Sequence, residues 1–202
     1  MNTSFLHSIA PQSRRIAACT GLSRQVRGFT LVELLIVMAV AAVLMGSAAP
    51  SLTNFVKSIQ LSSASNDLLA GLLMARSEAA KRNGRAAICK SANGLTCAPS
   101  GGWQQGWIVF HDANSNGVRD TGEAIIQRQE PLSADMRVTG NLNVARYVSY
   151  APSGLTKLAG GGFQAGTLTL CRHSLDGGEA RQIILSSSGR PRVQKTHVDS
   201  CA

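Results

Sequence analysis

The sequence predicts an α+β protein in which one long N-terminal helix packs on a small antiparallel β-domain. Two observations carry this prediction. Up to Asn83 the chain is an apolar run followed by apolar residues at helical spacing, and after Gly84 the apolar pattern changes to a period of two. Glycine, proline, asparagine and serine cluster between the period-two segments, which is typical of short strands joined by turns. Several short strands against one long helix make an α+β domain.

The first half of the predicted helix is an apolar run, residues 29–49, that contains a single charge, Glu33. The run is long enough to span a bilayer as a helix, which takes about 20 residues, so we expect residues 29–50 to be transmembrane. A carboxylate inside such a run is costly and marks Glu33 as a functional residue that needs a partner. The basic segment before the run is expected to stay on the cytoplasmic side; its arginines are Arg14, Arg15, Arg24 and Arg27.

The stretch Arg27-Gly28-Phe29-Thr30-Leu31-Val32-Glu33 resembles the class III signal of type IV pilins and of type II secretion pseudopilins. In that family the prepilin peptidase, a membrane enzyme, cuts after the glycine and methylates the new amine. The resemblance implies that residues 1–28 are a cleaved leader, that cleavage falls between Gly28 and Phe29, and that Phe29 becomes N-methylated. It also implies that Glu33 pairs with the N-terminal amine of the neighbouring subunit, which would remove the cost of its charge only in the assembled filament. An ordinary signal anchor with an accidental glutamate is the alternative, and the unusual length of the leader leaves open a start codon after Met1.

Residues 51–84 are predicted to be the amphipathic half of the helix. Gly84, directly after the basic residues Lys81 and Arg82, predicts its end. Pro50 at the junction is expected to bend or loosen the axis, and two separate helices are the alternative. The apolar residues expected to share the face toward the β-domain are Phe55, Ile59, Leu68, Leu69, Leu72, Leu73, Ala75 and Ala79.

Residues 85–202 are predicted to form the globular β-rich domain. Its candidate strands are residues 86–90, 106–111, 123–129, 136–139, 145–150, 167–172 and 182–187. The formal net charge is +9, and part of it lies in the leader. The remaining basic excess is compatible with a polyanionic partner but does not require one.

Four cysteines follow the leader, which itself holds Cys19. A domain outside the inner membrane lies where disulfides persist, and four cysteines allow three pairings. We favour Cys89–Cys97, which closes a short loop, together with Cys171–Cys201, which attaches the C-terminus to a strand. A zinc site is the alternative, although the spacing is not a pair of CxxC motifs.

The second half of the chain indicates which group of pilins and pseudopilins the sequence resembles. Residues 75–83, Cys89 and the stretch 106–117 resemble the GspH/FimT/FimU group of minor pilins and pseudopilins, and the FimT members most. The resemblance implies a pilin-like fold and a single-pass inner-membrane protein with a periplasmic globular domain, which later enters a pilus or pseudopilus. Its partners would be other pilins or pseudopilins, contacted through the N-terminal helix. No histidine or serine stands in a catalytic motif, so we expect no enzyme and no required cofactor.

The stretch from Asp112 to Glu123 matches the calcium-loop spacing DxNxNGx5E. It lies between two predicted strands rather than two helices, and aspartate, asparagine and glycine are also what a tight turn requires. A structural turn is therefore the favoured interpretation, with a calcium site as the alternative. The candidate ligands are Asp112, Asn114, Asn116, Asp120 and Glu123.

The C-terminal segment is basic. Gly189-Arg190-Pro191-Arg192 fits the GRxR pattern that carries DNA binding in FimT proteins of naturally transformable bacteria. The resemblance implies that Arg190 and Arg192, with Lys195 within reach, project from a stiff loop and contact successive phosphates of duplex DNA without sequence preference. A solvated basic tail, or a contact between subunits, is the alternative.

These features together predict a minor pilin-like subunit of a type IV pilus that takes part in pilus assembly, near the tip, and binds extracellular DNA for natural transformation. The chief alternative is a minor pseudopilin of type II secretion, of the GspH kind, that contacts secreted proteins. A calcium-dependent tip adhesin is a further alternative.

Overall fold

The computed structural model describes residues 28–201, and within them the side chains of all but residues 47–51 and 54. The chain divides into two compact units, residues 1–47 and 48–202, and each is described by itself. The predicted leader lies outside the described residues, except for Gly28. Helix α1 is assigned from Leu31 to Arg82.

In the first unit, α1 begins with a capping arrangement. The side-chain oxygen of Thr30 accepts a hydrogen bond from the backbone N–H of Glu33 at 3.2 Å, and the backbone oxygen of Thr30 accepts one from Leu34. Thr30 is therefore the N-cap, and Glu33 occupies the N3 position where a carboxylate suits the positive end of the helix dipole. Within the described residues, no helix is both long and apolar enough to cross a membrane. The predicted segment 29–50 includes residues 47–50, whose side chains lie outside the described set.

In the second unit, α1 presents one stripe of small and apolar residues to the core. These buried residues are Leu61, Ala64, Leu68, Leu72, Ala75 and Ala79, spaced three or four apart as one helix face requires. The face predicted from sequence was partly wrong, because Phe55, Ile59 and Leu73 are 63%, 51% and 45% exposed. They lie about a quarter turn or more away from the stripe, at 100° per residue.

The C-terminus of α1 is a Schellman motif. The N–H of Gly84 donates to the carbonyl of Ala79, and the N–H of Asn83 donates to that of Ala80. Asn83, with φ of 49°, takes the left-handed position, and the helix ends at Arg82, just before the predicted stop at Gly84. Just before this end, Glu78 accepts from Arg82 at 2.6 Å and from Lys81 at 3.3 Å.

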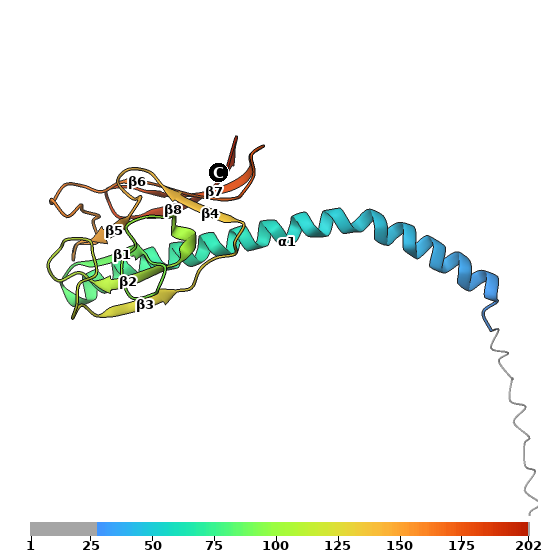
Figure 1. Cartoon of the computed structure of the whole chain (residues 1–202), viewed down its shortest axis with the longest axis horizontal. Helices are drawn as coiled ribbons and strands as arrows, with labels where there is room; N and C mark the ends of the chain where they lie inside the picture. Colours follow the sequence, from blue (N-terminus) through green and yellow to red (C-terminus); the bar gives the residue numbers. More distant parts are fainter. Residues whose placement is uncertain (1–27, 202) are drawn as a thin grey trace, which may run out of the picture. The chain divides into compact units, whose positions relative to one another are not determined.

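Two four-stranded antiparallel sheets follow the helix (Figure 1). The first has the order β3-β2-β1-β5 and the second has the order β4-β6-β7-β8. The strands are β1 Ala86–Lys90, β2 Trp107–His111, β3 Ile125–Gln129, β4 Met136–Gly140, β5 Tyr147–Tyr150, β6 Gly166–Arg172, β7 Gly178–Leu185 and β8 Pro191–Val198, with a short 3₁₀ helix η1 at Trp103–Gln105. One main core joins the α1 stripe to the inner faces of both sheets.

Strand β8 was not predicted. Residues 191–198 are polar and basic and begin with proline, so the segment lacks the alternating apolar pattern of a half-buried strand. The structure pairs it with β7 from Leu185↔Pro191 to Gly178↔Val198. Proline is tolerated as the first residue of an edge strand, and charges on an edge discourage pairing with other chains. The basic segment is therefore one arm of a hairpin rather than a free tail.

Candidate functional site

The β7–β8 hairpin carries the predicted DNA-contacting residues, and its loop, residues 186–190, has a fixed turn. The N–H of Gly189 donates to the carbonyl of Ser186 at 2.9 Å. Gly189 has φ of +74°, and a Cβ at this position would overlap the carbonyl oxygen of Gly154. Both constraints favour glycine.

The neighbouring segment 154–164 holds this loop in place. The buried hydroxyl of Thr156 donates to the carbonyl of Gln164 at 2.5 Å and lies 3.2 Å from the carbonyl oxygen of Ser186. The buried side chain of Gln164 accepts from the N–H of Ser149 and donates to the carbonyls of Asn143 and Tyr147. The hairpin loop therefore rests on the hydrogen-bonded segment 154–164. This support reduces the conformational entropy that the loop would lose when a ligand binds.

The structure separates the three predicted cations. Arg190 is exposed in the hairpin loop, and Arg192 is exposed on β8 opposite Ile184. Lys195 is opposite Arg181, whose guanidinium donates to the Ser62 hydroxyl of α1 at 3.1 Å. Directly paired residues share a sheet face, so Lys195 lies on the helix side and Arg192 on the other side. The strand register therefore does not bring Lys195 onto the sheet face that bears Arg192.

The face of the second sheet turned away from α1 bears a polar row and two arginines, beside an apolar cluster of Cys171, Ala180, Val198 and Cys201. One row runs across all four strands through Thr139, Thr169, Gln182 and Gln194. Arg137 on β4 and Arg192 on β8 share this face with that row, and among the described strand positions on it none is acidic. Such a surface can accept a polyanion without like-charge repulsion.

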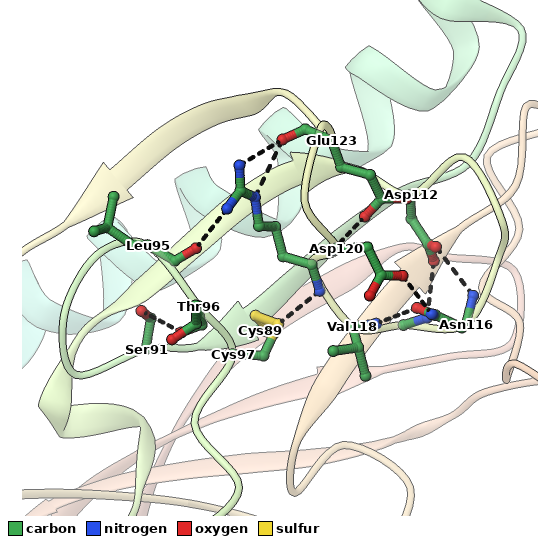
Figure 2. Close-up of a disulfide and its surroundings, with 12 residues drawn as sticks. Cys89, Ser91, Leu95, Thr96, Cys97, Asp112, Asn116, Val118, Asp120 and Glu123 are labelled. Carbon is green, nitrogen blue, oxygen red and sulfur yellow. Dashed lines mark hydrogen bonds between the residues drawn. A yellow bond between two sulfur atoms is a disulfide. The ribbon is translucent and has the colours of Figure 1, made fainter.

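The loop from Asp112 to Glu123 is closed by its own hydrogen bonds (Figure 2). Asp112 is fully buried and accepts from the backbone N–H groups of Asn116 and Gly117, both at 3.0 Å. Burial raises the pKa of the Asp112 carboxyl, against the lowering effect of these two bonds. Glu123 accepts from the N–H of Ala113 at 2.7 Å and of Asp120 at 3.0 Å.

The remaining candidate calcium ligands also serve the turn. The side-chain amides of Asn114 and Asn116 both donate to the same oxygen of Asp120 at 2.7 Å. These two bonds hold the pKa of Asp120 below its ordinary value. Amide nitrogens rather than oxygens thus face this carboxylate, and a calcium ion needs oxygens. Within the described residues, no group of three or more acidic, histidine or cysteine side chains is arranged to hold a metal ion.

Two disulfides are present, Cys89–Cys97 and Cys171–Cys201, the two pairs that the sequence predicted. Figure 2 shows the first beside the Asp112–Glu123 loop. Arg119 joins the two features: its N–H donates to the sulfur of Cys97 at 3.3 Å, and its guanidinium donates to the carbonyls of Glu123 and Leu95. Arg119 had no sequence signal, because its role depends on two loops that are distant in sequence.

The predicted processing and assembly residues lie in the first unit. Phe29 is 79% exposed, and a Cβ at Gly28 would meet no atom within 4 Å. Glu33 is exposed on the first turn of α1.

The fold is α+β, with a long N-terminal helix followed by two antiparallel sheets and two disulfides. Together with the N-terminal motif, this fold defines a pilin-like protein. The chain belongs to the family of the type II transport protein GspH, whose model matches residues 64–189, and the model of the prokaryotic N-terminal methylation motif matches residues 23–49. It is therefore a minor pilin or pseudopilin of the GspH/FimT/FimU type, and this is a family of structural, non-enzymatic proteins.

Known proteins resemble this chain in sequence or in fold. The pilin-like protein PilA1 of Thermus thermophilus is 27% identical over 83% of this chain and 98% of its own length. The crystal structure of the type IV minor pilin FimU of Pseudomonas aeruginosa superposes with a TM-score of 0.53 at 21% identity, over 73% of this chain and 99% of FimU. A second crystal form of FimU gives a TM-score of 0.50 at 20% identity, over 70% of this chain and 100% of the crystallised FimU chain.

Proposed function

We propose that this protein is a minor subunit of a type IV pilus that holds extracellular duplex DNA on its β7–β8 hairpin. The family places the chain in a pilus or a secretion pseudopilus; the pilus and the DNA are our proposal. The observation that carries it is the hairpin, in which Arg190 and Arg192 are exposed beside a loop held by Gly189 and Thr156. Guanidinium groups on a fixed support suit phosphate oxygens.

Assembly forms the first part of the proposal. The methylation-motif match covers Gly28, Phe29 and Glu33, so we propose cleavage after Gly28, N-methylation of Phe29 and insertion of residues 29–50 in the inner membrane. The globular unit would then be periplasmic until the subunit enters the filament. Glu33 would pair with the methylated amine of a neighbouring subunit, because an unpaired carboxylate in lipid is costly.

Mass spectrometry of the protein from piliated cells tests this part. The expected mature chain begins with N-methylated Phe29. Gly28→Ala should block cleavage, whereas Glu33→Ala should leave cleavage intact and lower the amount recovered in sheared pili. An intact leader on the parent protein, or cleavage at another bond, would overturn it.

DNA binding forms the second part, and it is independent of the first. The outer face of the second sheet supports it, since Arg137 and Arg192 share this face and its described strand positions carry no acid. A duplex would be held by its phosphates, and the hairpin has no phenylalanine, tyrosine or tryptophan on which an unpaired base could stack. Fluorescence anisotropy with a labelled duplex tests this part: the parent should bind, and the double variant Arg190→Ala, Arg192→Ala should lose most of the affinity.

A minor pseudopilin of type II secretion is the second candidate, and the name of the matching family model favours it. In that case the same hairpin would contact other subunits or secreted proteins. Deletion of the gene separates the two: loss of DNA uptake with normal secretion supports the pilus, and loss of secretion with normal uptake supports the pseudopilus. The tip-adhesin alternative requires calcium in the Asp112–Glu123 loop, and the hydrogen bonds of that loop favour a turn.

A further inference from the structure

A buried lysine lies at the end of β1. Lys90 is 5% exposed, and its ammonium donates to the carbonyl oxygen of Gly101 at 2.6 Å. An ammonium has three N–H donors, so one carbonyl leaves two of them for water or a ligand. Burial lowers the pKa of Lys90, and the nearby Arg146 lowers it further. Both effects describe a cation held where positive charge is unfavourable.

This lysine lines a cavity of about 390 Å³ between β1, β4 and η1. The opposite wall includes Arg137 of β4, and the backbone of Gly101 and Gly102 forms part of the rim. Among the described residues that line the cavity, none is acidic. The cavity is roughly large enough for a small oxyanion with its nearest waters, since liquid water occupies about 30 Å³ per molecule.

The 101–104 segment approaches β4 closely at two glycines that line the cavity. Gly101 has φ of +77°, and a Cβ on Gly102 would lie 2.8 Å from the carbonyl oxygen of Val138. These glycines let the 101–104 segment lie against β4 and place the Gly101 carbonyl on the ammonium. A methionine would fill the position of Lys90 without burying a charge, so the ammonium adds an unfavourable desolvation term to the fold. A bound anion would offset that term.

We propose that the cavity lined by Lys90 and Arg137 binds a small oxyanion of the phosphate class. Lys90 supplies buried charge-assisted donors, and Arg137 supplies a guanidinium at the wall. Arg137 has one nitrogen fixed by the carbonyls of Ala134 and Met136 at 2.9 and 3.0 Å, which orients its planar group. This site is separate from the hairpin loop, and only Arg137 belongs both to it and to the outer sheet face that bears Arg192.

The test uses the full chain in non-ionic detergent with inorganic phosphate as the probe. Thermal unfolding is followed at constant pH and constant ionic strength while phosphate replaces chloride, and the shift gives the affinity by linkage. We expect phosphate to stabilise the parent. Lys90→Met should weaken phosphate binding at least about tenfold, as the loss of one charge-assisted hydrogen bond implies. Lys57→Met, an exposed lysine outside the cavity, is the matched control and should bind as the parent does.

A second variant covers the case in which Lys90→Met does not fold. Arg137 lies on the cavity wall, so Arg137→Gln should weaken phosphate binding several-fold. Broadening of the ³¹P signal of phosphate measures this binding. No stabilisation of the parent by phosphate, or equal phosphate affinity in the parent, Lys90→Met and Arg137→Gln, would overturn the site.

The same variants separate two sources of the phosphate group. If Lys90→Met loses inorganic phosphate but keeps its affinity for a short DNA duplex, the site serves a free small anion. If both affinities fall together, the cavity accepts a phosphate of the DNA backbone, which Arg137 can reach from the face it shares with Arg192.

Discussion

Gly189 lies so close to Gly154 that a side chain at position 189 would overlap the Gly154 carbonyl oxygen. Arg76 of α1 meets the same residue: its Nε lies 3.0 Å from the position that a Cβ on Gly154 would take. Gly154 is therefore the point where α1, the segment after β5 and the β7–β8 hairpin meet. The glycine of the GRPR stretch has a structural role, and the arginines that follow it are left exposed.

Gly189→Ala should destabilise the protein by at least about 1–2 kcal/mol, because φ of +74° is unfavourable for alanine. Overlap of the new Cβ with the backbone of Gly154 should increase this destabilisation further. Chemical denaturation measures the change. Gly160→Ala is the control, since its Cβ would meet no atom within 4 Å and its φ is not positive. Equal stability of the two variants would show that the hairpin does not rest on Gly154.

The two disulfides should differ in their contribution to stability. Their sequence separations are 8 for Cys89–Cys97 and 30 for Cys171–Cys201, and the loop-entropy relation gives about 2.6 and about 3.7 kcal/mol, respectively. Cys201→Ser should therefore cost more than Cys97→Ser in urea unfolding. Non-reducing peptide mapping of the parent should recover these two pairs, and free thiols or crossed pairs would contradict the assignment.

Stability at acid pH should depend on Glu78. The hydrogen bond from Arg82, with a smaller effect of Lys81, holds the pKa of Glu78 below its ordinary value of 4.5. Between the folded-state and the unfolded-state pKa of Glu78, the unfolded protein binds more protons than the folded protein. The contribution of Glu78 to the free energy of unfolding is therefore present above pH 4.5 and is lost as the pH falls through the lowered pKa. The Tm difference between the parent and Glu78→Gln should shrink from pH 6 to pH 2. A difference that stays constant over this range would show that the pair contributes nothing.

Calcium should leave the melting temperature unchanged, because the oxygens of Asp112 and Glu123 already accept backbone N–H groups. Asp112→Ala should still destabilise the protein by about 2–3 kcal/mol, since two N–H groups at the buried turn lose their acceptor. Thermal melts of both proteins with calcium and with a chelator measure both effects. A calcium-dependent rise in the parent that is absent from Asp112→Ala would instead establish the metal site.

Local signals made much of the fold predictable. The change of period after Gly84 placed the helix before the sheets, and seven of the strands overlap the predicted segments. Amphipathic spacing alone did not identify the buried face, because Phe55 and Ile59 are as apolar as Leu61 and Leu68, and only the packed β-domain decides which of them it covers. Strand β8 was missed for the related reason that an edge strand needs no apolar alternation.

The site was less predictable than the fold. The exposed Arg190 and Arg192 followed from the Gly-Arg-Pro-Arg pattern, but the opposite orientation of Lys195 follows from the register Lys195↔Arg181, which only strand pairing fixes. Arg119 and Lys90 carried no local signal. Their roles depend on carbonyls that other segments supply, at Glu123 and Gly101.

The hairpin arginines should bind DNA, and fluorescence anisotropy with a labelled duplex measures this binding. The full chain in non-ionic detergent should bind without sequence preference. Two phosphate contacts predict a slope of log K against log salt of about −1.8, at about −0.9 per contact. The double variant Arg190→Ala, Arg192→Ala should lose most of the affinity and of the slope. The Arg→Lys pair should bind more weakly than the parent, and Lys195→Ala, on the other sheet face, should bind as the parent does. A double alanine variant that binds DNA with the affinity and salt slope of the parent would contradict the account.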